Sequence, residues 1–212
     1  MNAQKYTKKS LEAIQSAQEL ALANHNQQIE QIHVLAALLR QEEGLIPQLL
    51  KQMGITVESL DAAAMAEVRK LPQVTGSGRE ADKYYIARAV DTVFTEAETI
   101  ADSMKDEFVS VEHLFLALLD RGDNTVRRLM QTYRIEREQC MQVLMAIRGS
   151  QRVTTDTPEE TYEALKKYGT DLVAQAREKK MDPVIGRDDE IRNVCLLYTS
   201  GYSGNSGATG GK

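Results

Sequence analysis

The sequence predicts an all-α protein, in which two pseudo-symmetric helical repeats pack as one globular domain that is followed by a linker helix and a disordered tail. Three observations support this prediction. Apolar residues recur at helical spacing, as in Leu11, Ile14 and Ala17, and no stretch alternates as a strand would. The chain also resembles itself at an offset of 80 residues. Finally, 3 Phe, no Trp and 8 Met among 212 residues are typical of aliphatic helical packing.

The duplication needs no gap between residues 11 and 55 of the first copy. Unrelated amphipathic helices share some apolar positions, but they do not keep one register across several predicted connections. Two copies are too few for a solenoid, so we expect them to pack face to face as one domain. The identical pairs are Ala17/Ala97, Ala21/Ala101, His33/His113, Ala37/Ala117, Leu38/Leu118, Leu39/Leu119, Leu49/Leu129 and Ile55/Ile135.

Composition divides the chain into four segments. The stretch GSQRVTTDTPEE is polar and nearly free of large apolar residues, which is typical of a flexible linker. Five of the last twelve residues are Gly, and such a composition buries too little surface to order itself. The expected boundaries are 1–148 for the repeat domain (copies about 4–72 and 82–148), 149–162 for the flexible linker, 163–194 for a linker helix and the stretch MDPVIGRDDEIRNV, and 195–212 for the tail.

Polar residues and glycines mark where helices begin and end. Thr7 can cap the first helix, and Ser110 can cap the helix that holds His113, because their hydroxyls accept bonds from unpaired backbone N–H groups. Gly44, Gly54 and Gly122 mark turns.

The composition also argues against several classes of function. A formal net charge of −5 disfavours a nucleic-acid-binding protein. The longest apolar stretches, 34–39 and 113–119, are far shorter than the roughly 20 residues of a membrane span. The first residues lack the apolar run of a secretory signal, and Cys140 and Cys195 lie too far apart for a CxxC motif. We therefore expect a cytoplasmic protein without nucleic-acid or membrane partners.

No catalytic constellation is visible in the sequence. Paired carboxylates in an apolar setting, a nucleophile beside a base, and metal-ligand spacing are all missing. His33 and His113 occupy one repeat position, which favours packed or helix-capping histidines over metal ligands. We expect neither a metal nor a cofactor for these residues themselves.

The duplicated unit resembles the paired Clp N-terminal repeat. It reads IHVLAALLRQEEGLIPQLL in the first copy and FVSVEHLFLALLDRGDNTVRRLM in the second. The joint LPQVTGSG and the later stretch EALKKYGTDLVAQAREKKMDPVIGRDDEIRNV are similar to the junction between the N-domain and the first AAA+ module of ClpB-type disaggregases. The resemblance covers about residues 4–194. ClpA and ClpC unfoldases share the repeat and DPVIGR, so an adaptor-binding N-domain of a protease-linked unfoldase is the alternative.

The resemblance implies a domain that binds unfolded or aggregated clients and delivers them to a hexameric AAA+ motor absent from this chain. An intact protein of this kind would be a homohexamer that uses ATP and magnesium and works with a DnaK-type chaperone system. The client-facing residues would fall on Thr7, Phe94, Asp106 and Glu112. Each also has a structural interpretation, as helix cap, core residue, turn residue and first-turn helix acid respectively.

The same resemblance implies nucleotide contacts, but only in an intact AAA+ module. They would come from Asp182, Pro183, Val184, Ile185, Gly186 and Arg187. For the isolated fragment, Pro183 and Gly186 are equally explained as a turn before a helix.

The Gly-rich residues at the end of the chain do not form a phosphate-binding loop. That loop needs G-x-x-x-x-G-K-[ST], because backbone N–H groups cradle the phosphates and the last hydroxyl holds magnesium. Counting back from Gly211 and Lys212 puts Ser206 where the first Gly belongs, and no Ser or Thr follows Lys212. We therefore predict that this chain is not an enzyme.

Three hypotheses remain. The chain is a client-binding module of a disaggregase, a slightly truncated nucleotide hydrolase, or a passive tether or assembly domain.

Overall fold

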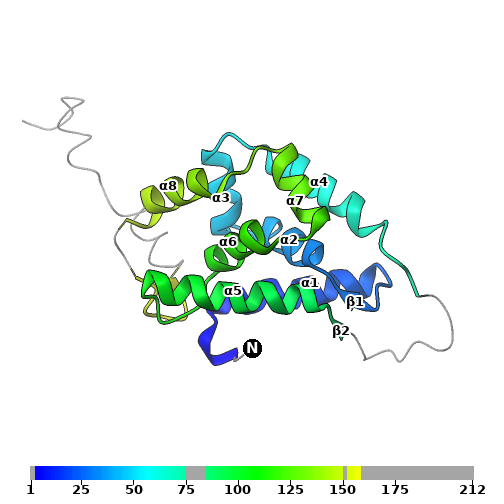
Figure 1. Ribbon diagram of the computed structural model, residues 1–212, viewed down its shortest axis with the longest axis horizontal. Coiled ribbons are helices and arrows are strands. Elements are labelled where there is room, and N and C mark those ends of the chain that lie inside the picture. Colours follow the sequence, from blue (N-terminus) through cyan, green and yellow to red (C-terminus); the bar gives the residue numbers. More distant parts are fainter. Residues whose placement is uncertain (1–2, 75–84, 150–151, 159–212) are drawn as a thin grey trace, which may run out of the picture. The chain divides into compact units, whose positions relative to one another are not determined.

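The computed structural model describes residues 3–74, 85–149 and 152–158. All of them belong to one compact unit, Met1–Lys167. They form helices joined by short connections, so the predicted all-α fold is confirmed (Figure 1). The predicted linker helix with the start of an AAA+ module (163–194) and the predicted tail (195–212) lie outside the described residues.

The first copy contains four α-helices after a short 3-10 turn, Ala3–Lys5. Thr7 begins the first of them as predicted, because its Oγ1 accepts the N–H of Ser10 at 3.2 Å. The elements are α1 Lys8–Ala23, β1 Gln28–Ile29, α2 Gln31–Leu39, α3 Leu45–Gln52 and α4 Val57–Val68.

The second copy repeats this order. Its elements are β2 Tyr85–Ile86, α5 Arg88–Met104, α6 Val111–Arg121, α7 Asn124–Thr132 and α8 Arg137–Arg148. Adding 80 to the bounds of α4 gives those of α8, so the duplication extends over all four helices, further than residue 55. The predicted capping role of Ser110 is also confirmed, since it forms a capping box with His113 at the start of α6.

Short extended segments of the two copies pair with each other. β1 pairs in parallel with β2, with Gln28 opposite Tyr85 and Ile29 opposite Ile86. A second parallel bridge joins Tyr6 to Val109. Subtracting or adding 80 converts this bridge into the Ile29–Ile86 pair, so the residues before the first helix of each copy bond to the other copy. This reciprocal pairing joins the two copies into one domain rather than two separate ones.

Helices α2 and α6 form the centre of the domain. They lie between α1 and α5 on one side and the remaining four helices on the other (Figure 1). Every residue of α2 is buried, as are residues 111–118 of α6. Such all-round burial requires a helix that is apolar on every face, which VLAALL and LFLALL supply. Each large side chain there contributes about 1.5–3 kcal/mol through burial.

The predicted turn glycines all lie at helix ends. Gly54 has a φ of +77°, a conformation that favours glycine. Gly122 ends α6, and a Cβ at this position would lie 2.5 Å from the carbonyl oxygen of Leu118, so only glycine fits without a shift.

The end of the domain differs from the sequence-based boundary. The composition places it near residue 148 and assigns 149–162 to a flexible linker, yet residues 152–158 lie against the domain. Val153 is completely buried, and its carbonyl accepts the N–H of Glu107 at 2.9 Å. One valine within a polar stretch leaves no periodic signal, which explains why the pattern missed it. Of the helices described, none is both long and apolar enough to cross a bilayer.

Candidate functional site

A buried histidine anchors the same position in both copies. In the first copy, His33 Nδ1 accepts the N–H of Glu30 at 2.9 Å, and Nε2 lies 3.0 Å from Asn26 Oδ1. Because a backbone N–H only donates, the proton of the neutral ring resides on Nε2, which donates to Asn26. Burial lowers the pKa of His33 to about 4, so the ring is neutral at neutral pH.

The second copy replaces the amide with a carboxylate. His113 Nδ1 accepts the N–H of Ser110 at 2.9 Å, and Nε2 donates to Asp106 Oδ2 at 3.0 Å. The other oxygen, Oδ1, accepts from the guanidinium of Arg148 and from the N–H of Val153, the latter at 2.9 Å. We call the buried residues Asp106, Glu112, His113 and Arg148 the Asp106 cluster.

Asp106 is charged despite its burial. Burial by itself raises the pKa of a carboxyl, but the hydrogen bonds from His113, Arg148 and Val153 and the charge of Arg148 together lower that of Asp106 to about 2. The carboxylate therefore joins α6, α8 and the segment after α8 at one point.

Glu112 is the least satisfied member of the Asp106 cluster. Its side chain is 1% exposed, and Oε1 lies 3.8 Å from Arg148 Nη1, beyond hydrogen-bond distance. Neither carboxylate oxygen accepts a hydrogen bond from any residue that the structure describes. A buried acceptor without a donor costs about 1–3 kcal/mol or more when it is charged. The site thus has unused capacity to accept hydrogen bonds.

The other two predicted client-facing residues lie at the adjoining seam, where Lys5 and Thr7 bond to Val109. The N–H of Thr7 donates to the carbonyl of Val109 at 3.0 Å. Phe94 packs edge-to-face against Tyr6, with ring centroids 6.4 Å apart. The structure therefore gathers Thr7 and Phe94 beside the segment that bears Asp106.

All four predicted client-facing side chains are enclosed in this conformation. Thr7, Phe94, Asp106 and Glu112 are 0%, 4%, 7% and 1% exposed. Their structural roles are plain, since Thr7 caps α1 and Phe94 belongs to the core. Their client-binding role stays a prediction, and it requires that the seam open. The predicted nucleotide segment, 182–187, lies outside the described residues.

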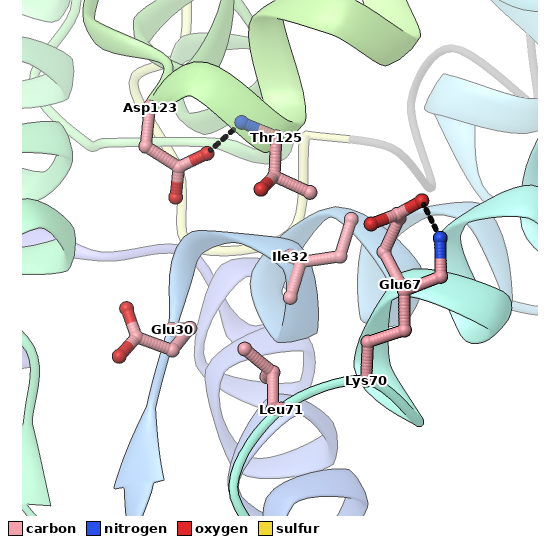
Figure 2. A pocket seen from close by; sticks show the side chains of 7 residues that line it. All are labelled: Glu30, Ile32, Glu67, Lys70, Leu71, Asp123 and Thr125. Atoms are coloured by element: carbon pink, nitrogen blue, oxygen red, sulfur yellow. Dashed lines mark hydrogen bonds and ion pairs between the residues drawn. The ribbon is translucent and has the colours of Figure 1, made fainter.

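A pocket that the sequence analysis missed lies where the first copy meets α7 of the second. It measures about 290 Å³ and is lined by the ends of α2, α4 and α7 (Figure 2). Figure 2 shows Glu67 bonded to Lys70 on one side, at 2.7 Å, and Asp123 bonded to the N–H of Thr125 on the other. Its apolar wall includes Ile32, the counterpart of Glu112. No periodic pattern could reveal it, because its lining residues come from three separate helices.

Two observations concern the metal-ligating and nucleophilic side chains of the described residues. They contain no group of three His, Cys, Asp or Glu side chains placed to hold a metal ion. Burial raises the pKa of Cys140 to about 11, so this thiol is protonated and unreactive at neutral pH.

These features define an all-α, double-repeat domain with one ionic and one neutral histidine site. A family model described as the Clp repeat (R) N-terminal domain matches residues 5–133. The chain belongs to this family. The chaperone protein ClpB of Bacillus cereus is 44% identical over 200 residues, which are 94% of this chain and 23% of that protein. ClpB of Nitratidesulfovibrio vulgaris is 44% identical over the same shares.

The predicted resemblance to the N-terminal region of ClpB-type chaperones is therefore confirmed. The chain spans about a quarter of the length of these relatives, 23% in both cases.

Solved structures share the fold. The Hsp104 N-terminal domain of Candida albicans has a TM-score of 0.64 at 23% identity, covering 73% of this chain and 98% of that one. A complex of the ClpV N-domain with a VipB peptide has a TM-score of 0.52 at 19% identity, covering 68% and 86%.

Proposed function

We propose that this chain is the substrate-recruiting N-terminal module of an ATP-dependent protein disaggregase, which binds unfolded or aggregated polypeptides and delivers them to an AAA+ motor. Family membership and the ClpB relatives support the class of protein. The ClpV N-domain, which has this fold, binds a VipB peptide, and this supports a peptide-binding use of the fold.

The observation that carries the proposal is the buried Glu112 carboxylate, which accepts no hydrogen bond from the described residues. A polypeptide in extended conformation offers backbone N–H groups, and Lys or Arg side chains offer cationic donors. Either would satisfy the carboxylate and offset its desolvation. Thr7, Phe94 and Asp106 line the seam through which a client would reach it, and they complete the proposed client-binding set.

The remaining chemistry belongs to the rest of the intact protein in this proposal. There, a homohexameric motor would bind ATP and magnesium, with residues 182–187 among its nucleotide contacts, and a DnaK-type system would supply clients. This chain would contribute binding and no hydrolysis.

Titration of the purified 212-residue chain with a fluorescein-labelled, permanently unfolded polypeptide such as carboxymethylated α-lactalbumin tests the proposal. Fluorescence anisotropy should report saturable binding. Glu112→Gln should weaken it about tenfold or more, because a hydrogen bond to a charged group is worth about 1.5–3 kcal/mol. The substitution removes a buried charge, so a circular-dichroism melt should show a folded domain.

Glu58→Gln on the exposed face of α4 is the matched control and should bind as the unmodified chain does. Equal affinity of the two variants would overturn the assignment of Glu112. Binding of no unfolded polypeptide, together with unchanged disaggregation by a full-length relative that lacks its N-domain, would favour a passive tether. Binding of a folded adaptor alone would favour a protease-linked unfoldase, and ATP turnover would favour a hydrolase.

A further inference from the structure

Residues 152–158, which we call the strap, contact the domain as a bound peptide would. Val153 uses both of its main-chain groups, since its N–H donates to Asp106 Oδ1 and its carbonyl accepts from the N–H of Glu107, each at 2.9 Å. Main-chain bonds of this kind, combined with a pocket for a side chain, are how domains recognise extended peptides. The Val153 side chain supplies the second part, because it is completely buried.

A second contact lies three residues further along the strap. The carbonyl of Asp156 accepts the N–H of Lys8 at 2.9 Å, and its carboxylate lies 3.3 Å from Lys8 Nζ. Between the two contacts the side chains of Thr154 and Thr155 are exposed, whereas Pro158 is buried again. The strap therefore touches the domain at separated points and leaves the rest to solvent.

The strap is not part of the continuous apolar core. That core ends, along the chain, at Leu144 of α8 and does not include Val153. The strap is instead fixed by Asp106, by one backbone N–H from the connection between α5 and α6, and by one from the start of α1. The three residues that bond to it, Asp106, Glu107 and Lys8, are likewise not members of that core.

The strap lies on the proposed client-binding residues. It bonds directly to Asp106, and Lys8, which it also contacts, is the neighbour of Thr7 in the chain. Asp106 shares Arg148 with the unsatisfied Glu112. A client segment that satisfied Glu112 would therefore bind next to Asp106, to which the strap bonds.

We propose that the strap is an internal ligand of this seam, and that an extended client segment carrying a small β-branched residue binds by displacing it. The proposal rests on the proposed client-binding function. Such a client would repeat the contacts of Val153, with its N–H on Asp106 and its carbonyl on the N–H of Glu107, and would add a donor for Glu112. Binding in trans would thereby release the strap from the domain.

Val153→Asp in the full chain tests the competition, because a charge cannot occupy the buried position without cost. The expected result is about tenfold tighter binding of the unfolded polypeptide, since a bound strap lowers the fraction of competent molecules. Thr155→Asp adds the same charge at an exposed position and should leave affinity unchanged. A peptide of sequence SQRVTTDTPEE should compete with the client for the Val153→Asp chain.

Amide resonances provide a readout that does not depend on the variant being fully stable. When client is added to the unmodified chain, the Lys8 and Glu107 amide signals should first move toward the positions that they have in the Val153→Asp chain, because the strap has left. Contacts with the client should then shift them further. Tighter binding together with this movement supports the strap as an internal ligand. Equal or weaker binding to Val153→Asp, with a normal client affinity of the unmodified chain, overturns this inference alone. Absence of client binding to both chains overturns the proposed function itself.

Discussion

Asn26 and Asp106 occupy the same position in the two copies, and each accepts a bond from the Nε2 of the histidine seven residues later. The first is an amide whose nitrogen also donates to the carbonyl of Pro72 at 3.1 Å, so the site is complete with neutral groups. The second is a carboxylate, which has only acceptor oxygens and therefore needs further donors. It obtains them from Arg148 and from the N–H of Val153.

The positions around these two residues are likewise charged in the second copy and uncharged in the first. Where the second copy has Arg148 and Glu112, the first has Val68 and Ile32, both apolar. A duplicated fold thus retains one neutral, self-sufficient site and one ionic site that recruits a cation from 42 residues away and holds the strap. The lesson is that duplication preserves the helices, whereas a carboxylate in place of an amide leaves one copy in need of further hydrogen-bond donors.

The largest effect should come from Arg148→Met. This variant leaves Asp106 and Glu112 buried without their counter-charge, and removing one partner of a buried ion pair typically costs about 3–5 kcal/mol. Urea unfolding followed by circular dichroism measures the loss. A loss in the free energy of unfolding below about 1 kcal/mol would mean that water reaches the cluster despite its burial.

A triple variant serves as its control. Asp106→Asn, Glu112→Ile and Arg148→Val together give the second copy the residues of the first. Because apolar replacement of a buried ionic network is often neutral or stabilising, most of the stability lost in Arg148→Met should return.

The two sites should also lose stability in different pH ranges. The pKa of His33 falls from 6.5 in the unfolded chain to about 4 in the folded one, so the unfolded state binds the proton first as the pH falls. Its contribution is complete above pH 6.5 and is lost toward pH 4, about 3 kcal/mol in total. The pKa of Asp106 falls from 3.8 to about 2, so its contribution, about 2 kcal/mol, is lost only below pH 3.8.

Urea unfolding at pH 7.5, 4.5 and 2.5 separates the two ranges. His33→Gln should flatten the dependence between pH 7.5 and 4.5 and leave the lower range intact. Asp106→Asn should do the reverse. A His33→Gln chain with the same slope between pH 7.5 and 4.5 as the unmodified chain would contradict the neutral state assigned to His33.

The smallest effect concerns two surface ion pairs that link the second and fourth helices of each copy. Arg40 pairs with Asp61 at 2.7 Å in the first, and Asp120 pairs with Arg137 at 2.9 Å in the second. Arg40 and Asp120 share a repeat position with opposite charge, but their partners do not, since Asp61 corresponds to Met141 and Arg137 to Val57.

Both pairs are partly exposed, so Arg40→Ala and Asp120→Ala should each cost about 0.2–1 kcal/mol. Most of that cost should disappear in 1 M salt. A thermal melt of each variant at low and high salt checks this, and unequal losses in the two copies would show that the pairs are not equivalent.

Much of the fold could be predicted because its determinants are local. The capping hydroxyls of Thr7 and Ser110 and the apolar runs around Leu38 and Leu118 all act within one helix, where spacing reports burial. The constant offset between the copies then predicts that they associate, because neither has a second apolar face of its own to cover the first.

The candidate site could be predicted only in part from the sequence. The resemblance to a family pointed to Asp106 and Glu112, but it did not reveal that both are buried around Arg148. That pairing joins positions far apart in the chain, and Val153 is a single apolar residue in a polar segment. Neither leaves a periodic signal, and the same holds for the pocket that includes Glu67 and Asp123.

The sequence by itself determined the helices, the duplication and the family, because helical spacing, capping groups and a repeated register are properties of neighbours along the chain. Only the tertiary structure decided which copy is ionic in its interior, which carboxylate lacks a donor, and that the strap bonds to the neighbouring Asp106. Hydrogen bonding and desolvation depend on which groups meet in space, and those groups are brought together by the packing of all eight helices that the structure describes.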